Sequence, residues 1–209
     1  MKKILIFTFL VINCILINAQ NRIISIEDYY SFINSDSAPE DDDFSDIYFK
    51  DINNIREPFL GNWEGSYNNR TYIIQISNYI QPAPENNSLA QRDTMLMRYR
   101  VVENGKVIKD VFNLQDGDPL IPVFNTFISP RNYSFYYASE EILCGRSGSI
   151  YFHLRGSDSL RISLRPSSQF IDLNDCPNGP VSQIFPVKGS VTLTRVDCCL
   201  LYTSPSPRD

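Results

Sequence analysis

The sequence predicts an all-β protein, built as an antiparallel barrel or sandwich of about eight strands. Two observations carry this prediction. From Gly61 to Val196, apolar side chains alternate with polar ones in one run after another, which is the period of a half-buried strand. Turn-forming residues, of which Asn104-Gly105 is the clearest pair, separate these runs at regular spacing. Together they favour strands that are joined by short hairpins.

The predicted strands follow one another along the chain. Their key positions are Gly61–Tyr67; Tyr72, Ile74 and Ile76; Met95, Met97, Tyr99 and Val101; Val107–Asn113; Tyr133, Phe135 and Tyr137; Ile150, Phe152 and Leu154; Leu160, Ile162 and Leu164; and Ser190–Val196. Because the side chains of a strand alternate between the two faces of a sheet, the apolar positions of each run should share one face and form the core.

Two segments precede the strands. Residues 20–44 are polar and acidic, with isolated aromatic side chains, and predict a flexible, loosely attached N-terminal arm. Residues Ser45–Glu57 predict a short helix with Ile47 and Ile52 near one side, which Pro58 would end. The helix and the strands would form a single domain over residues 45–198.

The first residues are typical of a secretory signal peptide. Lys2 and Lys3 precede an apolar stretch, and Ala19 is a small residue at a plausible cleavage point, so we expect residues 1–19 to be removed on export. The apolar stretch is shorter than the roughly 20 residues that a membrane span needs. Cys14 leaves open an alternative, a lipoprotein that is acylated at this cysteine. The soluble form, in the periplasm or outside the cell, is the expectation we favour.

The last residues have an unusual origin. Residues Cys199–Asp209 match, codon by codon, the translation of a transposase-type sequencing adapter. We therefore expect that this segment is not native, that Cys198 is doubtful because the adapter supplies part of its codon, and that the native C-terminus is missing. A genuine tail rich in proline and serine is the alternative.

Charge and cysteine content narrow the class of protein. The net charge of −5 argues against a nucleic-acid-binding protein, which needs a basic face. Of the five cysteines, Cys14 leaves with the signal and Cys198 and Cys199 belong wholly or partly to the adapter segment. The remaining two, Cys144 and Cys176, predict one disulfide in an exported protein. We expect a monomer.

A short motif at the start of the strands supports a more specific fold. Phe59–Gly65 reads FLGNWEG and resembles the first strand of the lipocalin and fatty-acid-binding (calycin) families, which opens with a Gly-x-Trp element. This resemblance implies an up-and-down calycin-like barrel in which Trp63 lies buried at one end, against Arg195 of the last strand. Gly61 and Gly65 would let neighbouring backbone pass close to the ring. The same stretch, with Tyr48–Asn54, also resembles a group of uncharacterised secreted proteins from flavobacteria.

The search for catalytic residues is negative. His153, the only histidine, has no carboxylate in its strand to act with it. Gly145–Ser149 lacks the final glycine of a nucleophile elbow. One histidine and two paired cysteines cannot build a common zinc site, and the acidic run Glu40–Asp43 lacks the alternating ligands of a calcium loop. We expect a protein that is not an enzyme and needs no metal or cofactor.

Two functions remain open. In the first, the barrel is a binding protein of the cell envelope that holds a small apolar or amphipathic ligand. Its cavity would be lined by Met95, Met97, Tyr99, Phe135, Phe152 and Leu154. In the second, the protein is a structural or interaction module with a filled core, which contacts a partner or a glycan through its arginine-bearing outer face. The sequence favours the first.

Overall fold

The structure is a computed structural model of the 209-residue chain. It describes residues 22–39, 43–82, 90–129, 131–138, 144, 147–167, 176, 181 and 183–196. The predicted signal peptide with Cys14, residues 40–42, 145 and 146, and the segment from Cys198 to Asp209 lie outside these residues. The chain divides into two compact units, a smaller one of Met1–Asn53 with Gln81–Asp93 and a larger one of Asn54–Ile80 with Thr94–Asp209.

The smaller unit combines a short parallel sheet with a short helix. In chain order it contains β1 (Arg22–Ser25), the 3-10 helix η1 (Ile26–Asp28), α2 (Tyr29–Ile33), β2 (Ile47–Lys50) and the start of β5 (Gln91–Glu103). β1 pairs in parallel with β2, and β2 pairs in parallel with Gln91 and Arg92 of β5. Tyr29 and Phe32 of α2 pack edge-on against Phe49 of β2. Residues that were expected to form a loose arm therefore contribute a strand, a 3-10 helix and an α-helix.

The helix predicted over Ser45–Glu57 is wrong. Ile47 and Phe49 are buried while the residues between and after them are more exposed, which is the alternation of a strand. Ile52, which the helix would have placed beside Ile47, is 54% exposed. Pro58 does not end a helix but lies inside the 3-10 helix η2 (Glu57–Phe59).

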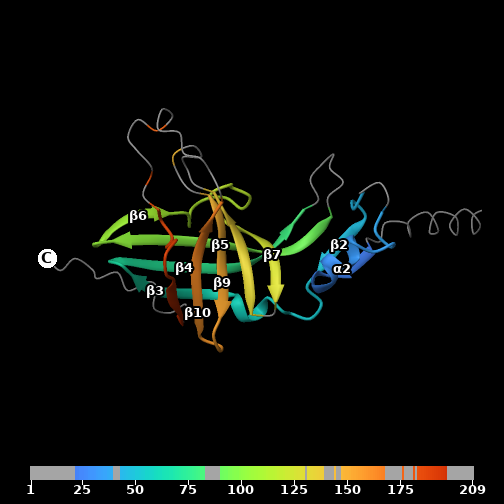
Figure 1. Ribbon diagram of the computed structural model, residues 1–209, viewed down its shortest axis with the longest axis horizontal. Helices are drawn as coiled ribbons and strands as arrows, with labels where there is room; N and C mark the ends of the chain where they lie inside the picture. Colours follow the sequence, from blue (N-terminus) through green and yellow to red (C-terminus); the bar gives the residue numbers. More distant parts are fainter. Residues whose placement is uncertain are drawn as a thin grey trace, which may run out of the picture. The chain divides into compact units, whose positions relative to one another are not determined.

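The larger unit is built from long neighbouring strands (Figure 1). They are β3 (Gly61–Tyr67), β4 (Arg70–Gln81), β5, β6 (Lys106–Asp110), β7 (Val123–Ser129), β8 (Asn132–Tyr137), β9 (Gly148–Leu154), β10 (Ser159–Pro166) and β11 (Val191–Val196). Their order in the sheet is β5-β4-β3-β11-β10-β9-β8-β7, and β6 forms a hairpin with β5. The first and last predicted strands, β3 and β11, are thus neighbours, with Trp63 opposite Arg195.

The sheet differs from the predicted one in the direction of some of its strands and in that it does not close into a barrel. All described strands belong to one eleven-stranded sheet, which is mixed because β1, β2 and β5 pair in parallel. An antiparallel sheet throughout is therefore a wrong prediction. β7 returns to β5, but their ladder is one residue pair, Leu96 and Val123, with a hydrogen bond from the Met97 N–H to the Pro122 carbonyl (2.9 Å). The structure is a mostly β fold whose sheet is not closed along this seam.

Period-two patterning correctly predicts most of the core. The buried cluster of the larger unit contains the inward residues of β3–β5 and β8–β11, among them Trp63, Ile74, Tyr99, Phe135, Phe152, Ile162 and Leu193. The Asn104-Gly105 turn is present: both residues have positive φ, of 51° and 79°, as a tight hairpin requires.

Candidate functional site

Trp63 and Arg195 are directly opposite one another in the β3–β11 ladder. Trp63 is 0% exposed, and its indole N–H donates to the Phe59 carbonyl at 2.9 Å. The guanidinium carbon of Arg195 lies 4.3 Å from the centroid of the Trp63 ring, so the contact predicted from the sequence is present. A cation over an indole contributes about 0.5–2 kcal/mol, depending on exposure.

The rest of the Arg195 guanidinium is occupied by backbone. It donates to the carbonyls of Leu60 and Pro58, the latter at 2.7 Å, and to the Ser157 carbonyl at 3.4 Å. These bonds hold the η2 corner and the β9–β10 turn against β11. Because the donors are used on carbonyls of the fold itself, this constellation is structural and offers no group to a ligand.

The two glycines near Trp63 meet different structural requirements: Gly61 has a positive φ, and Gly65 lies against the backbone of a neighbouring strand. Gly61 has φ of +114°, and a Cβ there would lie 2.9 Å from an Arg195 guanidinium nitrogen. A Cβ on Gly65 would lie 2.2 Å from the Thr192 carbonyl oxygen, because β11 backbone passes that close. Both support the predicted role, which was to permit close backbone approach at this corner.

The six residues predicted to line a cavity lie together, but as packed core. Met95, Met97 and Phe135 are 0% exposed, and the Phe135 and Phe152 rings are 4.7 Å apart. Tyr99 and Leu154 belong to the same cluster. A void large enough for a ligand would leave part of its lining accessible to a water-sized sphere. Because these side chains have almost no such surface, the space between them is filled by protein.

Phe185 completes this packing, and sequence reasoning missed it. Its ring lies 4.9 Å from that of Tyr99, 5.5 Å from Tyr137 and 5.9 Å from Tyr72. The sequence indicates a core residue here only by an aromatic side chain between Ile184 and Pro186. The segment around it has no strand periodicity that would predict its burial. A side chain of the core also holds the backbone next to Phe185, since the Tyr72 hydroxyl donates to the Ile184 carbonyl at 3.0 Å.

Burial affects the pKa of two side chains close to Phe185, those of Tyr72 and Arg70. Burial raises the pKa of the Tyr72 phenol, and the nearby Arg70 guanidinium partly opposes that rise. For Arg70 itself, burial lowers the pKa, but hydrogen bonding and attraction to Glu103 outweigh it and the net shift is upward. The Arg70–Glu103 ion pair, at 2.7 Å, lines a groove of about 350 Å³ to which Lys188 contributes a second cation.

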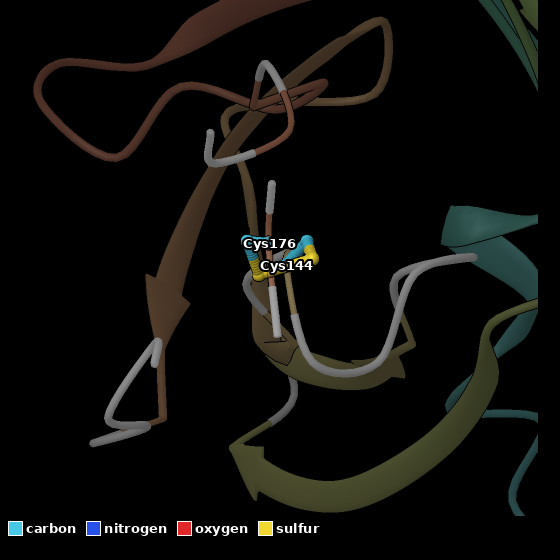
Figure 2. Close-up of a disulfide and its surroundings, with 2 residues drawn as sticks. All are labelled: Cys144 and Cys176. Atoms are coloured by element: carbon cyan, nitrogen blue, oxygen red, sulfur yellow. A yellow bond between two sulfur atoms is a disulfide. The ribbon is translucent and has the colours of Figure 1, made fainter. Parts of the chain in front are cut away.

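The predicted cysteine pair is confirmed. Cys144 and Cys176 have Cα atoms 5.5 Å apart and are joined by a disulfide across a sequence separation of 32 (Figure 2). Both residues are buried. Closing a loop of this size stabilises the fold by about 3–4 kcal/mol in the chain-entropy model.

Among the described residues, a groove on the outer side of β8–β10 is a candidate binding site. We call it the outer-face groove. It has a volume of about 410 Å³ and is lined by Asn132, Tyr151, Phe152, His153, Arg161, Ser163, Gly189 and Ser190. The ladders place Asn132 opposite His153, and His153 opposite Arg161, so these three side chains form one row across three strands.

The electrostatics of the outer-face groove are basic. No aspartate or glutamate occurs in β8, β9, β10 or β11. Arg161 donates through Nε to the Ser190 hydroxyl, and the Arg165 guanidinium lies 5.3 Å from the Tyr151 ring centroid. His153 shares a 2.6 Å hydrogen bond between Nδ1 and the Asn132 side-chain oxygen. That bond fixes the orientation of the imidazole ring within the row.

Metal sites and membrane-spanning helices were considered only within the residues that the structure describes. Within them, no group of three or more histidine, cysteine, aspartate or glutamate side chains is placed to hold a metal ion. None of the helices that the structure describes has both the length and the apolar character that a membrane crossing needs.

Comparison with known proteins identifies a family. The curated proteins and the solved structures give no match to this chain. A family model described as a family of unknown function (DUF6705) matches residues 1–133, which span the smaller unit and the strands β3–β7 of the larger one. Since the match covers more than half of the 209 residues, the chain belongs to the DUF6705 family.

Proposed function

We propose that this protein is a non-enzymatic, exported interaction module with a filled core, which contacts a partner or a glycan through the outer-face groove. The observation that supports it most is the packing of the six residues expected to line a cavity. Met95, Met97 and Phe135 have no exposed surface, and Phe185 fills the space beside Tyr99. A ligand among them would have to displace protein atoms, at the cost of the dispersion contacts of a packed core.

The outer-face groove has the features that the core lacks. It is open to solvent, falls within the 300–1,000 Å³ range of small-molecule sites, and offers charged, amide, hydroxyl and aromatic groups together. The groove beside Arg70 is comparable in size and also contains Lys188, but its lining includes an acid, Glu103, which is paired with Arg70 and would oppose an anionic partner. The outer-face groove is therefore the better docking site for a polar partner.

The proposal includes a calycin-like, barrel-shaped arrangement of the strands of the larger unit. Its strands lie beside their sequence neighbours, and β11 returns to β3. The β5–β7 contact through Leu96, Met97 and Val123 is where closure would occur. Export to the periplasm or the cell exterior is supported by the Cys144–Cys176 disulfide, because such bonds persist in oxidising compartments.

A glycan array tests the proposed binding function. The purified, oxidised protein is applied to an array of neutral and acidic glycans, beside a double variant, Tyr151→Ala with Arg161→Ala. We expect at least one glycan class to be retained, and the double variant to lose it. The matched control is Arg100→Ala, an arginine on β5 that is ion-paired with Asp110 at 2.7 Å and lies outside the groove; it should bind as the unaltered protein does.

Native mass spectrometry tests the alternative. If the core is filled, the purified protein should have the mass of its polypeptide, with no bound molecule. An apolar molecule that co-purifies, and that is lost when Met97 or Phe135 is enlarged to tryptophan, would favour the cavity function instead. Failure of every glycan to bind the array would count against the proposed use of the outer face.

A further inference from the structure

We infer that the outer-face groove recognises the carboxylate of an acidic saccharide, and that Arg161 is the residue that binds it. This inference rests on the proposed function and specifies its ligand. It is carried by three features of the groove: unused donors on Arg161, a described lining that contains no acid, and a set of neutral polar groups around an aromatic ring.

Arg161 has donors to spare. A guanidinium carries five N–H donors, and among the described residues the Arg161 side chain uses only Nε, towards the Ser190 hydroxyl. That bond fixes the plane of the guanidinium and leaves both terminal nitrogens for a ligand. Their fork geometry matches the two oxygens of a carboxylate, which is the strongest common pairing of an arginine.

The surroundings favour an anion. The lining of the groove contains no aspartate or glutamate, and Arg165 adds a second cation through its position over Tyr151. His153 donates its Nδ1–H to the Asn132 side-chain oxygen, so Nε2 of the neutral ring is an acceptor and suits a sugar hydroxyl rather than the anion itself. This face is cationic although the whole chain carries a net charge of −5. The attraction is therefore local to the groove and not a property of the protein as a whole.

The neutral groups indicate that the anion belongs to a sugar. Asn132, Ser163 and Ser190 offer amide and hydroxyl groups, each of which can donate and accept, as sugar hydroxyls do. Tyr151 adds an aromatic ring, and aromatic side chains combine apolar area with a polar tip. Tyr151 is paired with Ser163, and the Arg161–His153 pair lies two residues further along β9 and β10, on the same face of the sheet. The ring is thus next to the polar row on that face.

Trigalacturonic acid and its fully methyl-esterified form are the probes. The two have the same ring number and hydroxyl pattern but differ in charge. We expect the acid to bind the full-length protein in calorimetry or in amide chemical-shift titration, and the ester to bind at least tenfold more weakly. Affinity for the acid should also fall as salt is raised, because the groove is solvent-exposed.

Variants of two exposed arginines separate a built site from diffuse charge. Arg161→Ala should weaken binding of the acid by tenfold or more, and Arg161→Lys should restore only part of it, because lysine lacks the fork. Arg155→Ala removes the same charge from the end of β9 without touching the groove lining, and should change affinity by less than twofold. Thermal melts should show all three folded.

Each contrary result has a definite meaning. Equal binding of acid and ester, or equal losses in Arg155→Ala and Arg161→Ala, overturns the carboxylate site while leaving a glycan-binding module intact. If the acid does not bind, the inference fails, and the array then decides the proposed function. Retention of other glycans there keeps that function, and retention of none removes it as well.

Discussion

The two units of the molecule bury aromatic side chains beside different kinds of strand pairing. In the smaller unit, β1 and β2 have four residues each and pair in parallel, and Phe32 of the five-residue helix α2 packs against Phe49 of β2. In the larger unit, β4 and β5 reach 12 and 13 residues, and the other ladders are mainly antiparallel. Long ladders bury one contiguous cluster, so we expect the larger unit to dominate the free energy of unfolding.

Charge is also divided unequally. The described part of the smaller unit carries many acids, namely Glu27, Asp28, Asp36, Asp43, Asp46, Asp51 and Asp93, whereas strands β8–β11 have none. Some of these acids are structural: Asp93 accepts hydrogen bonds from the Tyr48 hydroxyl at 2.5 Å and the Asp51 N–H at 2.9 Å. The net charge of the chain therefore says little about the face that offers the groove.

Trp63→Ala should have the largest effect. Trp63 is fully buried, and its removal leaves a cavity and deprives Arg195 of its ring, so we expect a loss of about 3–5 kcal/mol in the free energy of unfolding. Urea denaturation followed by far-UV circular dichroism measures the loss, because the only tryptophan is gone. Trp63→Phe is the matched control and should cost less. A loss below about 1 kcal/mol would mean that the core of the larger unit is not what holds it together.

Removing the disulfide should cause the second-largest loss of stability. The double variant Cys144→Ala with Cys176→Ala should lose about 3–4 kcal/mol, because the unfolded chain regains the freedom of a closed loop. A reducing agent should lower the urea denaturation midpoint of the unaltered protein but leave that of the double variant unchanged. Hydrogen exchange in β1 and β2 should not respond, since both cysteines belong to the larger unit. A faster exchange there would contradict the independence of the two units.

The sequence predicts the larger unit well because its strands obey local rules. Alternation assigns Ile150, Phe152 and Leu154 to the core, and elimination assigns the Cys144–Cys176 pair, without any knowledge of topology. The contact of Trp63 with Arg195 needed a family resemblance, because residues so far apart in sequence meet only through the order of the strands.

The smaller unit and the groove escaped prediction for physical reasons. A four-residue strand such as β2 has too few alternations to be told from a helix, and its parallel partner β1 lies in a segment that looks like a polar arm. The outer-face groove depends on register, which brings Asn132, His153 and Arg161 together from three strands. Single-strand periodicity identifies each as outward but cannot place them opposite one another.

Two isoleucines allow a direct comparison of the units. Ile47 on β2 is 1% exposed and Ile74 on β4 is 0% exposed, so a change to valine removes one buried methyl group from each unit. Ile74→Val should lower the global free energy of unfolding by about 0.5–1.5 kcal/mol. Ile47→Val should instead speed hydrogen exchange in β1 and β2 and leave the global value nearly unchanged. Equal global losses would show that the two units unfold as one.

The smallest expected effect is a loss of stability at alkaline pH, which arises from Tyr72 in the larger unit. Burial raises the pKa of Tyr72 above its ordinary value of 10.0, with Arg70 partly opposing the rise. Above about pH 10, the unfolded phenol has lost its proton while the folded one still holds it, so the unfolded state binds fewer protons and stability falls as pH rises. Below that pH this residue adds no slope.

Tyr72→Phe isolates that contribution. The variant should be less stable by about 0.5–1.5 kcal/mol at pH 8, because the Ile184 carbonyl loses its hydroxyl donor. Between pH 10 and 11, however, its stability should fall less steeply than that of the unaltered protein, so the two curves converge as pH rises. Urea midpoints measured at half-unit steps give both slopes. Parallel curves would mean that the phenol is equally free to ionise in the folded and unfolded states, and that Phe185 does not seal the residues around it as tightly as their packing indicates.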